Sequence, residues 1–184
     1  TVVAIDYRDE LVPFANMMGS LHIGDNPNSA VAVTGLRVLC KGIYDEGNLL
    51  SNTFSSLSRV NPFDMELYWN VPLSGIYNAN NLISKDDGNT YYFTAEDGVY
   101  TMSNSGTGVL QLPLSIVSDV LCFQDEEYSI YNPADSTTTY FNRDVLYIND
   151  AENSKNTIYK YNLDIGAYID TIVVDSPVKD IAFY

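Results

Sequence analysis

Two short acidic segments have the residue types that could bind a divalent cation. Asp86 and Asp87 precede a Gly-Asn turn, and Asp150 and Glu152 stand at alternate positions in another turn. Carboxylate and amide oxygens are the ligands that Ca²⁺ prefers. Neither segment has the alternating ligands and distal Glu of an EF-hand loop, and acidic turns are commonly just solvated. We therefore expect no cofactor, with calcium at these residues as the alternative.

Aromatic side chains are the second set of candidate site residues. Trp69, Tyr91, Tyr92 and Tyr100 could stack on a sugar or on a partner protein, because each ring offers a large apolar face. The alternative is sheet packing, since the chain has 15 Tyr and tyrosine is typical of half-buried strands. Both interpretations remain open from the sequence.

The residue types needed for catalysis are sparse. His22 is the only histidine, so any Ser-His-Asp or Cys-His catalytic set would have to include it. It stands between two apolar residues, a position that is more typical of a structural histidine. The chain has no Gly-rich phosphate loop that precedes a helix. Two of the 24 acidic residues could form a glycosidase pair, but the sequence does not show their separation. We expect the chain not to be an enzyme, and a carbohydrate-active enzyme is the less favoured alternative.

Two cysteines, Cys40 and Cys122, lie in apolar, strand-like runs. Buried free thiols are favoured at such positions. A single disulfide is the alternative if the protein is secreted. Two cysteines with no nearby histidine do not make a zinc site.

Charge and composition restrict the partners. The net charge is −15 over 184 residues, which disfavours contact with nucleic acid or with anionic lipid. No apolar run reaches the length of about 18 residues that a membrane-spanning helix needs, so membrane insertion is not expected. The first residue is Thr1 rather than Met, as in a chain whose signal peptide has been removed or whose end has been trimmed. We expect an extracellular, cell-surface or periplasmic protein.

Most of the chain has the pattern of short strands joined by turns. Residues 9–21 are the best helix candidate, but Pro13 and Gly19 limit it to a turn or two, while residues 25–29 and 55–62 are expected to be irregular. Turn-forming segments rich in Gly, Asp and Asn separate the apolar runs. The predicted strands are residues 30–33, 36–42, 49–54, 66–71, 81–84, 90–94, 99–103, 109–112, 119–124, 128–131, 137–141, 145–149, 157–162, 167–174 and 180–184.

Internal repetition organises these strands. In each copy a strand leads into a Pro/Ser connection and then into an apolar strand. The copies are NVPLS (70–74) followed by NLIS (81–84), QLPLS (111–115) followed by DVLCF (119–123), and TIVVDSP (171–177) followed by DIAF (180–183). Pro72 and Pro113 are 41 residues apart, and a period of roughly 40–50 residues is typical of propeller blades.

These residues resemble known β-propeller repeats. The stretch DGNTYYFTAEDGVYTMSNSG (87–106) resembles the two-component-regulator propeller repeat, in which a DGN turn precedes two strands joined by a Gly-containing turn. The stretch from residue 156 to residue 184 resembles blades of bacterial surface and periplasmic propellers. The resemblance implies an all-β fold of antiparallel hairpin repeats, with about four blades or a fragment of a larger ring. A β-sandwich is the alternative.

The repeats suggest an organisation and a function. Residues 1–61 would be irregular strands that could complete the array, and residues 62–184 would be the propeller-like repeats. The expected function is a non-enzymatic, extracytoplasmic module that binds a protein or glycan partner through its loops. The alternative is a structural subunit of a surface fibre, sheath or particle.

The alternation also predicts a core and a role for the last strand. The residues expected to be buried are Leu82, Leu110, Leu112, Val120, Phe123, Ile158, Ile172, Ile181 and Phe183. Replacing a buried Phe183 with Ala would cost about 3–5 kcal/mol. The predicted strand at residues 180–184 has no following partner in the sequence, and an open apolar edge favours aggregation. We expect it to pair with an N-terminal strand of the same chain, with self-association through this strand as the alternative.

Overall fold

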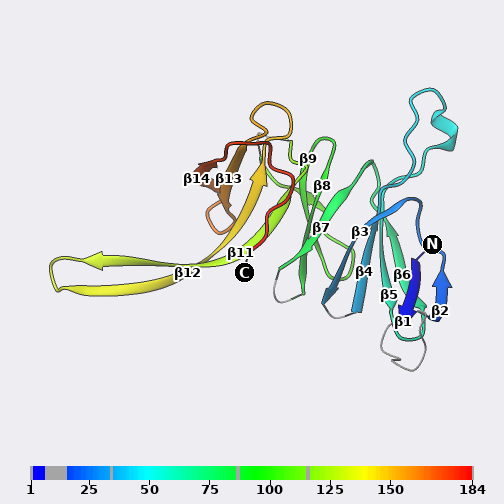
Figure 1. The fold of residues 1–184 in the computed structure, drawn as a ribbon, viewed down its shortest axis with the longest axis horizontal. Coiled ribbons are helices and arrows are strands. Elements are labelled where there is room, and N and C mark those ends of the chain that lie inside the picture. The colour runs from blue at the N-terminus through cyan, green and yellow to red at the C-terminus, as the bar shows by residue number, and fades with distance from the viewer. Residues whose placement is uncertain (1, 7–15, 34, 86–87, 115–116, 184) are drawn as a thin grey trace.

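The structure is a computed structural model that describes residues 2–6, 16–33, 35–85, 88–114 and 117–183. These residues fold almost entirely into antiparallel strands (Figure 1), as the aromatic and β-branched composition predicts. Within these ranges the one helix is the short 3-10 turn η1 (Leu49–Ser51). The expected all-β class is confirmed.

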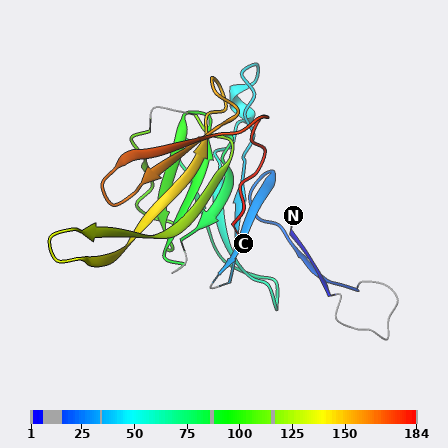
Figure 2. The ribbon, with the colours of Figure 1, turned by 60° about the vertical axis from the view of Figure 1, so that its left-hand side comes forward.

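Three four-stranded antiparallel sheets make up the body of the molecule. Within each sheet the spatial order of the strands is their order in the sequence, so each sheet is a meander. A separate hairpin of β1 (Val2–Asp6) and β2 (Asn16–Leu21) lies apart from these sheets (Figure 2).

The first sheet contains β3 (Pro27–Val33), β4 (Gly35–Cys40), β5 (Ser56–Asn61) and β6 (Glu66–Pro72). The second contains β7 (Asn80–Ser84), β8 (Thr90–Ala95), β9 (Gly98–Ser103) and β10 (Leu110–Gln111). The third contains β11 (Leu121–Asn132), β12 (Thr137–Asn149), β13 (Thr157–Asn162) and β14 (Ala167–Val173).

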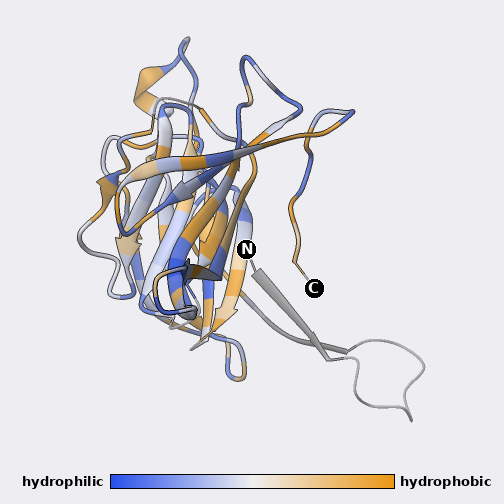
Figure 3. Ribbon diagram, turned by 90° about the vertical axis from the view of Figure 1, so that its left-hand side faces the viewer, coloured by the Kyte–Doolittle hydropathy of each residue, from blue (hydrophilic) through white to orange (hydrophobic). Residues whose placement is uncertain are grey.

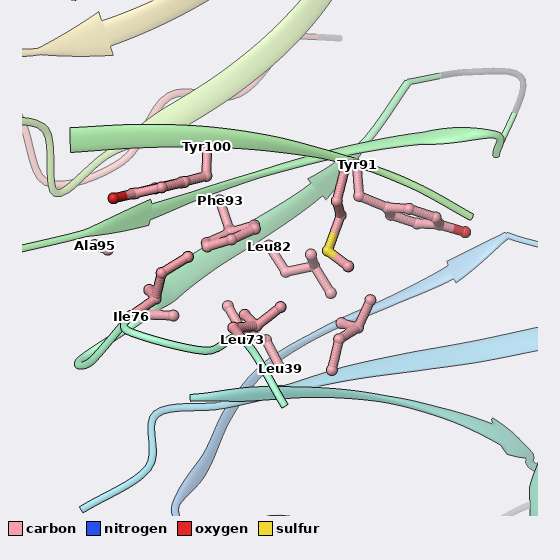
Figure 4. Packing of buried hydrophobic residues seen from close by; sticks show 11 residues of the cluster. Leu39, Leu73, Ile76, Leu82, Tyr91, Phe93, Ala95 and Tyr100 are labelled. Atoms are coloured by element: carbon pink, nitrogen blue, oxygen red, sulfur yellow. The ribbon is translucent and has the colours of Figure 1, made fainter. Parts of the chain in front are cut away.

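The second sheet is the middle layer of the stack. Tyr91 and Phe93 of β8 pack with Leu39 of the first sheet in one buried cluster, which Figure 4 shows from close by. Tyr92, which points to the other side of β8, packs in a second cluster with Leu146 of the third sheet. Because both faces of the second sheet are covered, β8 is buried along almost its whole length. This burial explains why its sequence, TYYFTA, lacks the polar alternation of a surface strand.

The outer faces of the stack are covered by other parts of the chain. Val38, Cys40 and Val60 lie on the face of the first sheet that points away from the second, and they pack with Ile23 in a third cluster. Residues 174–183 run across the outer face of the third sheet. There the Val178 N–H donates a hydrogen bond to the Lys155 carbonyl oxygen at 2.7 Å. Figure 3 shows hydrophobic residues in this C-terminal segment.

The Pro/Ser segments of the repeat are the connections between sheets. Pro72 ends β6, and the chain then crosses to β7 in the second sheet. Pro113 follows β10 in the same way, and the chain crosses to β11 in the third sheet. One repeat of the sequence therefore corresponds to one four-stranded sheet. The boundary expected between residues 61 and 62 falls in the β5–β6 hairpin, inside the first sheet, so the sheets do not follow that division.

Four predictions of local structure are wrong. Residues 56–61 form β5, a central strand, because hydrogen bonding to β4 and β6 outweighs the weak strand preference of Ser and Arg. Residues 49–54 form η1 and one isolated bridge instead of a strand. The part of the helix candidate that is described, residues 16–21, is strand β2, and residues 9–15 lie outside the described ranges. Strand β3 begins at Pro27, inside the segment expected to be a loop.

The C-terminal strand is also not observed. Residues 180–183 have no strand partner in the structure, and residue 184 lies outside the described ranges. Phe183 remains 46% exposed and contacts the Tyr147 ring edge-on, with 4.7 Å between centroids. Leu110 and Ile172 are exposed as well, so these three residues are not core residues. Leu82 and Val120 are buried as predicted, while the remaining residues of the expected core are half-buried: Leu112, Phe123, Ile158 and Ile181.

A long hairpin projects from the third sheet. Residues 119–124 and 128–131 were expected to be two strands, but β11 runs unbroken over 12 residues, and β12 is likewise continuous over 13. Strand β13 pairs only with Val145–Asn149 of β12. The outer part of the β11–β12 hairpin therefore has no neighbouring strand within the described chain and extends away from the body (Figures 1 and 2). We refer to residues 128–142 as the arm.

Candidate functional site

Three of the four aromatic candidates are core residues. Tyr91 is fully buried, and Tyr92 and Tyr100 are nearly so. Figure 4 shows Tyr91 and Tyr100 within the cluster between the first and second sheets. Because protein covers almost all of their surface, these rings offer little area for stacking on a ligand. Burial, together with a hydrogen bond to Asp97 at 2.8 Å, raises the pKa of Tyr100 to about 12.

Trp69, the fourth candidate, differs because it lines a surface hollow. The hollow has a volume of about 590 Å³ and lies where the first and second sheets meet. Its lining combines one aromatic ring with side chains that donate or accept hydrogen bonds, and none of the described lining residues is acidic. The lining residues are Arg59, Trp69, Asn89, Ser103, Asn104 and Ser105.

Strand register places the two arginines beside Trp69. Arg37 on β4 lies opposite Arg59 on β5, and Arg59 lies opposite Trp69 on β6. The fully buried Arg37 guanidinium lies 5.6 Å from the Trp69 ring centroid and 5.7 Å from that of Tyr91. Burial lowers the pKa of Arg37, and the nearby charge of Arg59 lowers it further. The cation supports the Trp69 ring from within the protein through a cation–π contact.

Two turns of the second sheet complete the hollow. The Asn104 N–H donates to the Asn89 carbonyl oxygen at 2.7 Å, which joins the β9–β10 turn to the start of β8. The Asn104 side chain accepts a hydrogen bond from Arg37. Gly106 has φ +76°, and a Cβ on it would lie 2.9 Å from Val71 and 3.4 Å from the Trp69 ring. Only glycine allows this turn to press against Trp69, so the hollow is built by packing as well as by polar contacts.

Of the four candidate cation ligands, the structure describes two, Asp150 and Glu152. Asp150 is buried and accepts hydrogen bonds from the backbone N–H groups of Glu152 at 3.1 Å and Asn153 at 2.9 Å, which caps the turn after β12. Glu152 is exposed. Asp86 and Asp87 lie outside the described residues. Elsewhere in the described chain, no group of three or more His, Cys, Asp and Glu side chains is arranged to hold a metal.

Both cysteines are free thiols in the structure, on different sheets. Cys40 is buried in the third cluster, and Cys122 is half-buried on the outer face of the third sheet. Burial raises the pKa of each thiol, and for Cys122 the negative charge of Asp180 raises it further. Both sulfurs are therefore protonated near neutral pH and are poor nucleophiles.

Sequence reasoning missed an ion-pair network at the base of the arm. Glu126 accepts hydrogen bonds from Arg143 at 2.8 Å, from Lys160 at 2.8 Å and from the Tyr147 hydroxyl. Burial alone would raise the pKa of Glu126, but its contacts with Lys160 and Arg143 outweigh this effect and lower it. In the sequence Glu126 belongs to an acidic triplet that resembles a solvated turn, and its partners come from β12 and β13. Only their pairing register could have identified this network.

The comparisons with known proteins do not assign this chain to a family. No family model matches the chain, and no curated protein matches its sequence. The described part of the chain contains no helix long and apolar enough to cross a membrane.

Proposed function

We propose that this chain is a non-enzymatic, extracytoplasmic β-repeat module that binds a glycan in the hollow beside Trp69. The observation that carries the proposal is the combination of a supported indole ring with Arg59, two asparagines and two serines around one hollow. Sugars present apolar C–H faces next to hydroxyl groups. A site with one aromatic platform and several small polar side chains matches that chemistry.

The architecture supports a propeller-like arrangement over a sandwich. The three sheets are meanders that follow one another in the sequence, and the middle sheet packs on both neighbours. Propeller blades are four-stranded meanders of this kind, whereas a sandwich has two facing sheets. We propose that the three sheets are blades of such an array, in which loops at the junctions between blades form the binding surface.

The character of the lining favours binding over hydrolysis. A glycosidase needs two carboxyl groups on either side of the scissile bond. The six described residues around the hollow supply a guanidinium, amides, hydroxyls and an indole, but no carboxyl group. These residues could therefore bind a sugar, but they supply neither the catalytic acid nor the nucleophile that a glycosidase needs.

Trp69 makes the proposal directly testable, because it is the only tryptophan of the chain. Titration with a panel of oligosaccharides, followed by tryptophan fluorescence and calorimetry, should identify a glycan that changes the emission of Trp69 as it binds. By calorimetry, Trp69→Ala should weaken that binding by roughly 5- to 150-fold, since an aromatic platform at the centre of a site is worth about 1–3 kcal/mol.

Phe63→Ala is the matched control. Phe63 is 81% exposed in the turn that joins β5 to β6, on the same hairpin as Trp69 but outside the hollow. This variant should bind the glycan as the unmodified protein does. Equal binding by Trp69→Ala would contradict the proposed site, and a panel with no binding saccharide would contradict the glycan function.

A further inference from the structure

The arm, residues 128–142, has a composition unlike the rest of the chain. Its only charged residue is Asp135, although charged residues make up 18% of the sequence and the net charge is −15. It contains three tyrosines, one phenylalanine and one isoleucine among Ser, Thr and Asn residues. The five large apolar or aromatic side chains are 37–65% exposed; they are Tyr128, Ile130, Tyr131, Tyr140 and Phe141. A projecting ribbon with a single charge and several exposed aromatic rings has the features of an interaction surface.

One face of the arm is apolar and joined to the body. Tyr128 and Phe141 lie opposite each other on the two strands, and their rings stack with 5.4 Å between centroids. Ile130 follows on the same face, since side chains alternate along a strand. The Arg143 guanidinium lies 5.0 Å from the Tyr128 ring centroid and also forms an ion pair with Glu126. The base of the arm is therefore anchored to the ion-pair network.

The free edge of β12 in the arm can be identified from the hydrogen bonds at its base. The Asp144 carbonyl oxygen accepts from the Leu163 N–H at 2.9 Å, and the Asp144 N–H donates to the Asp164 side chain at 3.2 Å. Both backbone groups of Asp144 thus point away from β11. Backbone groups in an antiparallel pair alternate with a period of two residues. The N–H and C=O groups of Thr138, Tyr140 and Asn142 therefore point to the same side, where no described strand pairs with them.

This edge lacks the usual features that prevent strand pairing. Residues 137–142, TTTYFN, contain no Lys, Pro, Gly or charged residue. Threonine and aromatic residues have high strand preference, and such a segment at an open edge readily accepts another strand. Natural edge strands normally carry a charge, a proline or a bulge, and the β11–β12 pairing is regular throughout.

We propose that the arm is a self-association element, in which the β12 edge pairs antiparallel with the β12 edge of a second copy around a two-fold axis at Tyr140. The backbone groups of Tyr140 then bond to those of Tyr140 in the second copy, and Thr138 pairs with Asn142 on each side. Residues directly opposite in this register lie on the same face of the ribbon, so the two apolar faces adjoin. The product is a four-stranded ribbon in the order β11-β12-β12-β11.

Charge identifies a second copy as the occupant. Two copies, each with a net charge of −15, repel each other over most of their surfaces, but the arm edge brings together residues without charge. A basic partner would instead be drawn to the acidic body and would find no acidic group along residues 137–142. The edge is also self-complementary, because one strand supplies both partners of an isologous pair. The proposal does not depend on the glycan site.

Tyr140→Pro tests the edge directly. The Tyr140 N–H points away from β11, so proline removes an intermolecular donor without removing a hydrogen bond of the hairpin itself. By sedimentation equilibrium the unmodified protein should rise from 20.5 kDa toward twice that mass with concentration. Tyr140→Pro should stay at 20.5 kDa. Tyr140→Ala keeps the backbone donor and should still form the dimer.

The controls separate edge pairing from other causes. Thr138→Pro, which removes a second outward N–H, should also be monomeric and covers the case in which Tyr140→Pro misfolds. Circular dichroism should show the same strand content for all variants, because the arm lies outside the core. Three results would overturn the proposal. The first is an unmodified protein that stays monomeric up to about 100 μM, which is about 100 times a dissociation constant of 1 μM. The others are undiminished association of both proline variants and loss of the dimer in Tyr140→Ala.

Discussion

Arg37 and Glu126 are charged residues whose partners lie on other strands and turns. Arg37 is fully buried between two aromatic rings and donates to Asn104. Glu126 is held by Arg143 and Lys160, on two different strand segments of the third sheet. A buried charge is tolerated only where such partners replace water. Three of the nine basic residues of the chain therefore stabilise the two proposed sites: Arg37 beside the hollow, and Arg143 and Lys160 at the base of the arm.

Glu126→Gln should destabilise the protein in a pH-dependent way. The pKa of Glu126 is lowered in the folded protein, so the carboxylate contributes stability at pH values above its unfolded pKa of about 4.3. That contribution is lost as the pH falls through the folded pKa. Urea denaturation at pH 7 should show a loss of about 2 kcal/mol, and the difference from the unmodified protein should shrink at about pH 3.

Glu127→Gln is the neighbouring control for this prediction. Glu127 is exposed and lies on the opposite face of β11, away from Arg143 and Lys160. Its replacement should change the free energy of unfolding by less than about 0.5 kcal/mol at either pH. An equal effect of the two substitutions, or a Glu126→Gln effect that does not vary with pH, would contradict the role of the ion-pair network.

At the scale of elements, turns were predicted better than strand continuity. Gly-containing turns such as that between β8 and β9 were correctly placed, because glycine supplies the positive φ that the backbone needs. The predicted strands at residues 119–124 and 128–131 leave residues 125–127 between them, yet β11 runs through these residues without a break. Their middle residue, Glu126, is held by Arg143 and Tyr147 of β12 and by Lys160 of β13. The residue pattern of one strand does not show which residues of other strands lie beside it, so the arm and its ion-pair network could not be predicted.

The β9–β10 turn can be tested through two of its glycines. Gly106 and Gly108 both have positive φ, +76° and +66°, but only at Gly106 would a Cβ meet Val71 and Trp69. Gly108→Ala should cost only the backbone penalty of about 1–2 kcal/mol. Gly106→Ala should cost about 1–3 kcal/mol more, because it adds overpacking. The emission of Trp69 should shift only in Gly106→Ala, measured by fluorescence of the native protein and by urea denaturation.

Equal costs for the two substitutions would contradict the close packing of this turn against Trp69. An unchanged Trp69 emission in Gly106→Ala would do the same. Reduced glycan affinity in Gly106→Ala, with normal affinity in Gly108→Ala, would connect this packing to the proposed binding site.

At the scale of the whole molecule, the repeat was visible in the sequence but the layering was not. The first two Pro/Ser connections, at Pro72 and Pro113, lie where one sheet ends and the next begins. Which strand faces are buried depends on how the sheets stack, and β8 buries both of its faces because it lies in the middle. For that reason Tyr91, Tyr92 and Tyr100 could not be separated from Trp69 by residue type. The C-terminal copy of the motif resembles the others, but without a neighbouring strand it lies along the third sheet as an extended segment.

The stacking of the sheets predicts very different costs for two phenylalanines. Phe93 is fully buried between the first and second sheets, so Phe93→Ala should lower the free energy of unfolding by about 3–5 kcal/mol. Phe183 is 46% exposed, and its one described aromatic contact is with Tyr147. Phe183→Ala should therefore lower the free energy of unfolding by less than about 1 kcal/mol. Urea denaturation of both variants at the same pH measures the difference. Similar losses would mean that residues 174–183 are as much a part of the core as β8, as the sequence pattern alone suggests. A small loss for Phe183→Ala beside a large loss for Phe93→Ala would instead place the main stabilising interface between the sheets.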